Sequence, residues 1–227
     1  MSTSLEQKVK ELNAILGKLI QNDIRLWLKA EEIETFENFL YEIIKQTGNF
    51  IKYETFANEL WLSNKTVKKY LFFLQKSLIV HKVPPFFRDK TKEISSHSKF
   101  YVLDTGFVSL LLKHFGDKLN DGKFVETFVL TELVKHIDVD LHQIKVYKKT
   151  NQTEIDFILE KFDGKLIPIE AKAGESKAIP KAFYSFAKAY GSEVEFFVKT
   201  TKKSYLTKKL ENFNVFFVPF WLVNNVI

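Results

Sequence analysis

The sequence predicts a mixed fold of the α/β class, α+β overall, with a helical N-terminal part and a layered C-terminal domain. Three observations support this prediction. The 227 residues exceed the usual length of one domain. Apolar residues recur at helical spacing through the first 80 positions. After Gly122, short apolar strands alternate with helical segments, which is typical of a layered α/β domain.

The N-terminal part reads as a helical extension, residues 1–34, followed by a domain over residues 35–117. The expected helices cover residues 5–28, run from Thr35 as N-cap to Gly48, cover 53–60, and start again after Ser63. The last three form a helix, a short helix, a tight turn and another helix. This is the order of a helix-turn-helix.

Two predicted strands turn this helix-turn-helix into a winged one. Residues 79–83 and 100–103 are apolar and β-branched, and a basic loop over residues 88–99 separates them. Residues 64–99 hold nine lysine or arginine residues against two acidic ones, whereas the whole chain has a net charge of +6. Such a concentration favours a phosphate-binding surface, although a solvated basic face has the same composition.

The C-terminal domain is expected over residues 118–227. It should begin with a helix over 123–138 and contain a second helix at about 177–190. The expected strands are Ile144–Tyr147, Glu154–Leu159, Leu166–Ala171, Val194–Val198 and Val215–Val218.

Charged residues occupy two of these strands where burial is expected. Strict alternation puts Glu154, Asp156 and Ile158 on one face of the first strand. Glu170 and Lys172 share a face of the second strand. A turn at Asp163-Gly164 predicts that the strands pair as a hairpin, with Asp156 beside Glu170.

This arrangement suits phosphodiester hydrolysis. Two neighbouring carboxylates repel each other unless a cation lies between them, and Asp156 with Glu170 therefore predicts a Mg²⁺ or Mn²⁺ site. A bound divalent ion polarises a phosphate and activates water. Lys172 would orient the water or stabilise the developing charge. Glu126, on the preceding helix, would join through a metal-bound water. A solvated strand pair with alternating charges is the alternative interpretation.

The set Glu126, Asp156, then Glu170-Ala171-Lys172 resembles the P-D-(D/E)-X-K nuclease superfamily. A longer stretch resembles the C-terminal half of a prokaryotic AAA-type ATPase family whose last domain has no characterised function. That resemblance rests on Lys99–Gly106, Glu126–Leu133, Glu154–Phe157 and Ile169–Lys172. It implies a winged helix followed by a restriction-endonuclease-like fold. The chain has no G-x-x-x-x-G-K-[ST] motif, so any ATPase would be a separate partner chain.

We therefore expect a nucleic-acid-binding protein with a magnesium-dependent, endonuclease-like centre that acts on DNA in preference to RNA. The catalytic candidates are Glu126, Asp156, Glu170 and Lys172. The nucleic-acid contacts are expected from Lys65, Lys68, Lys69, Arg88, Lys90, Lys92, Lys99, Lys148 and Lys149. A homodimer is a further expectation, because nucleases of this superfamily that cut both strands are often dimers.

Two other functions remain open. One is a non-catalytic DNA-binding or regulatory module that keeps the nuclease fold. The other is a protein-interaction module that docks a partner through the apolar stripe of residues 5–28. The absence of cysteine excludes disulfides and thiolate zinc sites. We expect a cytoplasmic protein with no membrane contact, since the N-terminus lacks an apolar core and the most apolar stretch, residues 213–223, is short.

Overall fold

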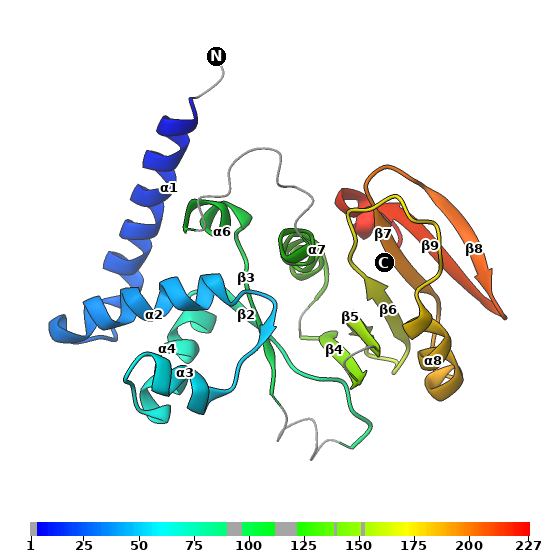
Figure 1. Cartoon of the computed structure of the whole chain (residues 1–227), viewed down its shortest axis with the longest axis horizontal. Helices are drawn as coiled ribbons and strands as arrows, with labels where there is room; N and C mark the ends of the chain where they lie inside the picture. Colours follow the sequence, from blue (N-terminus) through cyan, green and yellow to red (C-terminus); the bar gives the residue numbers. More distant parts are fainter. Residues whose placement is uncertain (1–3, 90–96, 112–121, 139, 151–152) are drawn as a thin grey trace. The chain divides into compact units, whose positions relative to one another are not determined.

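Figure 1 shows the computed structural model of the chain, which describes residues 4–89, 97–111, 122–138, 140–150 and 153–227. The chain divides into two compact units. The first contains Met1–Lys82 and Phe100–Lys118, and the second contains Val83–Lys99 and Leu119–Ile227. Helices dominate the first unit and a sheet dominates the second, which confirms the mixed α and β class. Among the described residues, no helix is both long and apolar enough to cross a membrane.

Two helices of the first unit, α1 and α4, begin at a serine side-chain cap, whereas α2 begins at Ile33 without one, so the predicted N-cap at Thr35 is wrong. Ser4 accepts a hydrogen bond from the backbone N–H of Gln7 at the start of α1, and Ser63 accepts one from Thr66 at the start of α4. The predicted N-cap at Ser63 is thus confirmed. The helices are α1 (Leu5–Leu19), α2 (Ile33–Lys45), α3 (Tyr53–Glu59), α4 (Asn64–Lys76) and α6 (Thr105–Leu111).

The helix expected over residues 5–28 is shorter than predicted. After α1 the backbone widens into a π-helical turn, Ile20–Ile24, and a 3₁₀ turn at Ala30–Glu32 leads into α2. Four apolar residues of this segment point inward. Leu16, Ile20, Ile24 and Leu28 are buried in the same cluster as the core residues of α2 and α4. The part of the apolar stripe from Leu16 to Leu28 is therefore largely covered within its own unit, whereas Leu5 and Trp27 remain exposed.

A small three-stranded sheet accompanies the helices of the N-terminal part of the chain. It consists of β1 (Asn49–Phe50), β2 (Val80–Val83) and β3 (Lys99–Val102), in the spatial order β1-β3-β2. The two strands predicted on either side of the basic loop are both present. The chain order α2, β1, α3, α4, β2, β3 is the one that a winged helix would have. Lys90 and Lys92, which were predicted in the loop, lie outside the described residues.

The second unit is built on a six-stranded sheet with the order β4-β5-β6-β7-β9-β8. β5 and β6 form the predicted antiparallel hairpin, and β7 lies parallel to both β6 and β9. The elements are α7 (Gly122–His136), β4 (Gln143–Thr150), β5 (Thr153–Glu160), β6 (Leu166–Glu170), α8 (Lys181–Tyr190), β7 (Phe197–Thr201), β8 (Leu206–Leu210), β9 (Phe213–Pro219) and the 3₁₀ segment Phe220–Asn225.

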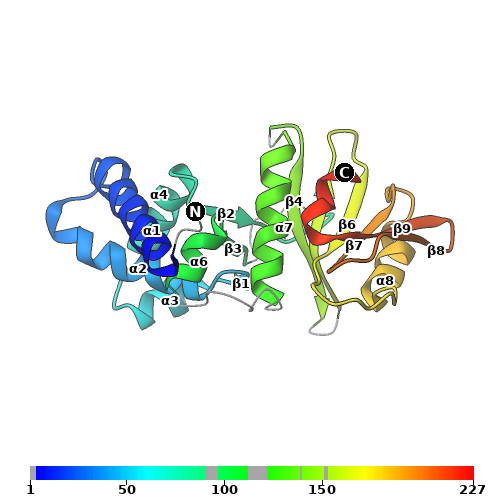
Figure 2. The same cartoon turned by 90° about the horizontal axis from the view of Figure 1, so that it is seen from above.

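Aromatic packing fixes α8 against one face of this sheet. Phe183 and Phe186 are fully buried, and they lie against Phe197 and Tyr147 respectively. Each aromatic side chain removes a large apolar area from water, which makes this interface a main source of stability. Figure 2 shows α7 beside β4, away from α8.

The alternation predicted for β5 is interrupted by a bulge. The β4–β5 register shifts between Lys145 and Tyr147, whose partners on β5 are Ile158 and Ile155. One residue of β4 thus faces two residues of β5, Asp156 and Phe157. Ile155 and Ile158 consequently pack in the same core. The expectation that Ile158 shares a face with Asp156 is therefore wrong, because the extra residue reverses the alternation after Asp156.

Other boundaries differ for local reasons. Pro180 precedes α8, so the helix starts at Lys181 and not near residue 177. The strand expected over Val194–Val198 is β7, at Phe197–Thr201, and Val194 makes only an isolated bridge to Leu166. β8 was not predicted, since its inner positions are polar and exposed, which is typical of an edge strand.

We predict that Ile24→Ala lowers the free energy of unfolding by about 2–4 kcal/mol, because it leaves a cavity in a fully buried position. Ile15→Ala, an exposed position on α1, is the matched control and should change stability by less than about 0.5 kcal/mol. Urea unfolding followed by tryptophan fluorescence measures both. Equal effects of the two substitutions would show that residues 5–28 do not share the core of the first unit.

Candidate active site

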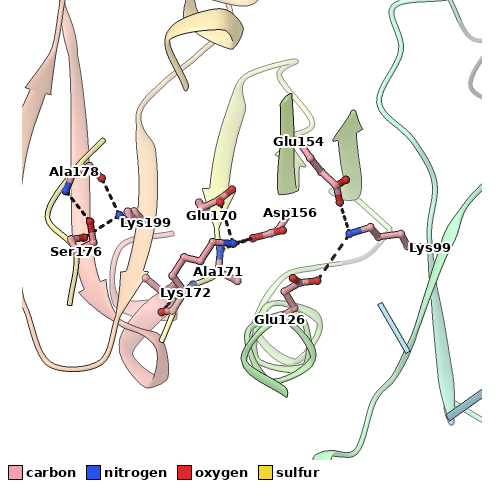
Figure 3. Close-up of polar contacts among 11 residues, drawn as sticks. Lys99, Glu126, Glu154, Asp156, Glu170, Ala171, Lys172, Ser176, Ala178 and Lys199 are labelled. Carbon is pink, nitrogen blue, oxygen red and sulfur yellow. Dashed lines mark hydrogen bonds and ion pairs between the residues drawn. The ribbon is translucent and has the colours of Figure 1, made fainter. Parts of the chain in front are cut away.

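The β5–β6 hairpin brings two carboxylates to neighbouring positions. Its turn is closed by a hydrogen bond from the Lys161 N–H to the Lys165 carbonyl at 2.8 Å, and Gly164 supplies the positive φ of 79°. Phe157 pairs with Ile169 in this register, and Asp156 and Glu170 lie one residue beyond that pair. The two side chains converge in Figure 3. The predicted proximity of Asp156 and Glu170 is therefore present in the structure.

The ammonium group of Lys172 lies between the two carboxylates. Its Nζ atom is 3.3 Å from Asp156 Oδ2 and 3.0 Å from Glu170 Oε1 (Figure 3). Asp156 Oδ2 also accepts a hydrogen bond from the Ala171 N–H at 2.9 Å. Both carboxylate side chains are largely buried, whereas 46% of the Lys172 side chain is exposed. The cation is therefore the one member of this triad with ready access to solvent.

Burial of the triad changes the acidity of its members. Burial and then the negative charge of Asp156 raise the pKa of Glu170 to about 7, although Lys172 acts in the opposite direction. Burial alone would lower the pKa of Lys172, but Asp156 and Glu170 outweigh it and raise that pKa above its ordinary value. Glu170 Oε2 is buried and has no hydrogen-bond partner among the described residues. One carboxylate oxygen thus remains available for a further ligand.

The backbone of Lys172 is held by the next strand. The Lys172 N–H donates to Thr200 Oγ1 at 2.7 Å, and the Thr200 hydroxyl donates to the Lys172 carbonyl at 2.9 Å. Lys199, which pairs with Glu170 in the β6–β7 register, donates from Nζ to the carbonyls of Ser176 and Ala178, both at 2.8 Å. β7 therefore fixes the segment that carries Lys172 in two places.

A pocket of about 360 Å³ opens beside Glu170 and Lys172. Its other lining residues come from the segment between β6 and α8 and from β7, namely Gly174, Ser176, Ala178, Ile179, Pro180 and Lys199. The carboxylate of Glu170 and the ammonium of Lys172 both reach this space. A ligand entering the pocket would thus meet the two groups with the most perturbed pKa values of the unit.

Glu126 has a different environment from the predicted one. It lies on α7 with Oε2 at 3.9 Å from Lys99 Nζ, and Lys99 also contacts Glu154 at 2.5 Å (Figure 3). Among the described residues, no three acidic or histidine side chains are grouped closely enough to hold a metal ion. The charge of Glu126 nevertheless contributes to raising the pKa of Lys172, and its role through a metal-bound water stays a prediction.

Lys99, for which we predicted a nucleic-acid contact, is engaged in ion pairs with both glutamates. Only 6% of its side chain is exposed, and its charge is matched by Glu154. Burial would raise the pKa of Glu154, but Lys99 and then Lys148 outweigh it and lower that pKa. Lys99 is thus a structural cation within the second unit.

Two carboxylates still provide a chemically reasonable divalent-cation site. Magnesium in proteins is often held by one or two carboxylates, with waters and substrate phosphate completing the shell. Asp156 and Glu170 provide this number, and the unpartnered Glu170 Oε2 is a suitable donor atom. Lys172 occupies the position between them, so a divalent ion would have to displace its Nζ atom.

The other predicted basic contacts differ in how accessible they are. On α4, Lys65 and Lys68 are exposed, whereas Lys69 donates to Glu32 at 2.7 Å. Arg88 forms an ion pair with Glu193 and lies over the Tyr190 ring. In β4, Lys149 is exposed and Lys148 lies 3.4 Å from Glu154.

Three features of this unit were not predicted, namely Lys199, Thr200 and the pair of Lys145 with Glu160. Lys145 is fully buried, and its Nζ atom lies 2.5 Å from Glu160 Oε2. A lysine inside an otherwise apolar strand was the available signal in both β4 and β7. No local pattern identifies its partner, which lies 15 or more residues away.

Two family profiles match the chain. One, described as Domain of unknown function (DUF8612), matches residues 2–118, and the other, described as Domain of unknown function (DUF4143), matches residues 121–222. The first covers more than half of the 227 residues, so the chain belongs to that family. No curated protein and no solved structure matches the chain. Neither description assigns an activity.

We predict that Glu170 makes the chain less stable as pH rises from about 4.5 to 7. The folded-state pKa of Glu170, about 7, lies above its unperturbed value of 4.5, so folding favours the protonated carboxyl. Its contribution to the free energy of unfolding is therefore complete below pH 4.5 and is lost as the pH rises through 7. This difference corresponds to about 3 kcal/mol. Unfolding free energies of the native chain and of Glu170→Gln, measured at pH 5, 6, 7 and 8, should diverge by this order. Glu37→Gln, at an exposed site, should follow the native profile.

Proposed function

We propose that this protein is a nucleic-acid-binding, metal-dependent phosphodiesterase whose centre consists of Asp156, Glu170 and Lys172. The proposal rests on one observation. The ammonium group of Lys172 lies between two buried carboxylates, those of Asp156 and Glu170, and Glu170 Oε2 has no hydrogen-bond partner. Two adjacent buried carboxylates destabilise the folded state unless a cation compensates their negative charges. A divalent cation held by both carboxylates would offset their negative charges and leave the Lys172 ammonium for a phosphate oxygen.

Each residue has a role that follows from its position. Asp156 and Glu170 would hold the divalent ion, for which magnesium or manganese suits the oxygen donors. A divalent cation supplies Lewis acidity toward a phosphate oxygen and lowers the pKa of water. Asp156 is kept in place by the Ala171 N–H, so it offers a fixed ligand atom. Glu170 carries a pKa near 7 and can release its proton at neutral pH.

Lys172 is suited to act on the phosphate and not on the metal. Its ammonium is half exposed and stays protonated at neutral pH, because the adjacent carboxylates raise its pKa. Once displaced from the carboxylates, Nζ can donate hydrogen bonds to the attacked phosphate and stabilise its growing negative charge. Thr200 holds the backbone of Lys172, so this movement involves only the side chain.

The substrate class is supported by the first unit. The order of its helices and strands fits a winged helix-turn-helix, and α4 presents Lys65 and Lys68 to solvent. Lysines on such a helix bind the phosphate backbone, and DNA is the preferred proposal over RNA. A homodimer and a separate ATPase partner chain remain part of the same proposal.

One observation favours a second candidate, a nucleic-acid-binding module without catalysis. Lys172 already neutralises both carboxylates, as in a purely structural ion-pair triad. In that case the triad joins β5 to the segment after β6 and needs no metal. The two candidates differ in whether a divalent ion displaces Lys172.

We predict that the purified chain cleaves DNA in the presence of Mn²⁺ or Mg²⁺, and that Asp156→Ala or Lys172→Ala lowers the rate by at least about 100-fold, as expected for groups that stabilise the transition state. Glu175→Ala, an exposed carboxylate on the same segment, is the control and should retain the native rate. Gel analysis of labelled single- and double-stranded DNA provides the measurement. Absence of metal-dependent cleavage, or equal rates in Asp156→Ala and native protein, would favour the non-catalytic module.

We also predict that the affinity for Mn²⁺ alone rises about tenfold per pH unit up to pH 7 and then levels off. Glu170 must lose its proton to bind the ion, and its pKa is about 7. Calorimetric titrations between pH 5.5 and 8.5 measure this dependence. Glu170→Gln should bind more weakly and lose most of the pH dependence. A flat profile in the native chain would exclude Glu170 as a ligand.

A further inference from the structure

The exposed face of α4 and of the turn before it alternates aromatic and basic side chains. Trp61, Lys65, Lys68, Phe72 and Lys76 are all exposed and follow one another at intervals of three or four residues. Within α4 this spacing keeps the three lysines and Phe72 on one side of the helix, and Trp61 lies in the turn that precedes it. The opposite side of α4 is the buried one, formed by Val67, Tyr70, Leu71 and Leu74. We call the five exposed residues the α4 face.

Trp61 is held in an unusual position. Its side chain is 95% exposed, and its backbone has a φ of 56°, in the left-handed region that bulky residues rarely adopt. The Leu62 N–H donates to the Ala57 carbonyl at 2.8 Å, so the turn between α3 and α4 requires this conformation. A glycine would satisfy the turn without strain. The indole therefore contributes little to the fold, and exposed side chains at strained positions are typical of functional sites.

Phe72 is the second aromatic residue of the face. Its side chain is 53% exposed, and the Lys76 ammonium lies 5.6 Å from the centre of its ring. α4 contains four lysines and no acidic residue. Lys69 is the lysine that an acidic partner, Glu32, neutralises. Lys76 thus lies beside the Phe72 ring, and the other two lysines of the face lie between Trp61 and Phe72 in the sequence. The exposed acidic residues that precede the face, Glu54 and Glu59, belong to α3.

We propose that the α4 face binds a single-stranded stretch of nucleic acid, with Trp61 and Phe72 stacking on bases and Lys65, Lys68 and Lys76 contacting phosphates. This proposal rests on the nucleic-acid partner of the proposed function and not on the candidate active site. Aromatic rings combined with basic residues provide sequence-tolerant binding of unpaired strands. The helix from Lys65 to Lys76 is about 16 Å long, a length that about five stacked nucleotides span.

The pattern of the face favours this ligand over a duplex or a protein. In a duplex the faces of the bases are covered by their neighbours, so Trp61 and Phe72 would meet only base edges. A helix that docks on a protein usually presents a continuous apolar stripe, whereas two lysines separate the rings here. The face therefore has the charge of a phosphate-binding surface and the apolar rings of a base-stacking one.

The experiment measures binding of a fluorescent twelve-nucleotide oligo(dT) to the full chain by anisotropy, in EDTA to prevent cleavage. A twelve-base-pair duplex and heparin, a polyanion without bases, are the competitors. We expect the oligo(dT) to bind more tightly than the duplex. Trp61→Ala and Phe72→Ala should each weaken oligo(dT) binding by about 5- to 100-fold and leave heparin binding unchanged.

Two further variants separate binding from folding. Trp61→Gly relieves the strained backbone, so its melting temperature should equal or exceed that of the native chain while its oligo(dT) affinity falls. Tyr41→Ala removes another exposed aromatic ring, which has Lys45 at 5.2 Å from its centre but lies on α2, and it should bind like the native chain. Lys65→Ala should lower the slope of log affinity against log salt by about 0.7.

Three results would overturn the proposal. These are native oligo(dT) affinity in Trp61→Ala, tighter binding of the duplex than of the oligonucleotide, and equal losses of heparin and oligo(dT) binding in the aromatic variants. An acidic protein partner would be the remaining explanation for the first result. Native oligo(dT) binding in EDTA together with absent metal-dependent cleavage would count against the active-site proposal alone, so failure of that proposal and failure of this one give different results.

Discussion

The contact of Lys172 with Asp156 and Glu170 is the interaction on which the second unit depends. The β5–β6 register places two buried carboxylates side by side, and an uncompensated pair would oppose folding at neutral pH. The ammonium group of Lys172 offsets the repulsion between the two carboxylates only if the backbone of Lys172 is held in place. Thr200 provides this restraint through two hydrogen bonds, and Lys199 fixes the following residues. The strand order β5-β6-β7 thus serves to assemble one charged triad.

The same unit resolves buried charge in other places with lysine. Lys99 contacts Glu126 and Glu154, and Lys145 contacts Glu160. These pairs are complete, because each ammonium has carboxylate oxygens within reach. The triad differs from them, since Glu170 Oε2 has no partner and the cation is half exposed. This difference is the physical reason to place chemistry at the triad and stability at the other pairs.

Local patterns in the sequence were sufficient for the outline of both units. The N-cap at Ser63, the Asp163-Gly164 turn and the hairpin that unites Asp156 with Glu170 each depend on residues close in the chain, and each is present in the structure. The bulge in β5 was not predictable, because it depends on β4 pairing and not on the strand's own pattern. The pairing of Lys99 with Glu126 and Glu154 joins residues 27 and more positions apart, for which the sequence contains no signal.

The basic segment of residues 64–99 shows why charge in sequence overstates charge at a surface. Lys69, Arg88 and Lys99 all have acidic partners within the folded chain. The +7 of this segment therefore does not all reach solvent, and part of its positive charge stabilises the fold. The lysines of the α4 face alone form a small patch, and a few phosphate contacts give only weak, salt-sensitive binding. Two exposed aromatic rings beside those lysines would add affinity that salt does not screen, which accounts for a tryptophan in a turn that glycine would fit without strain.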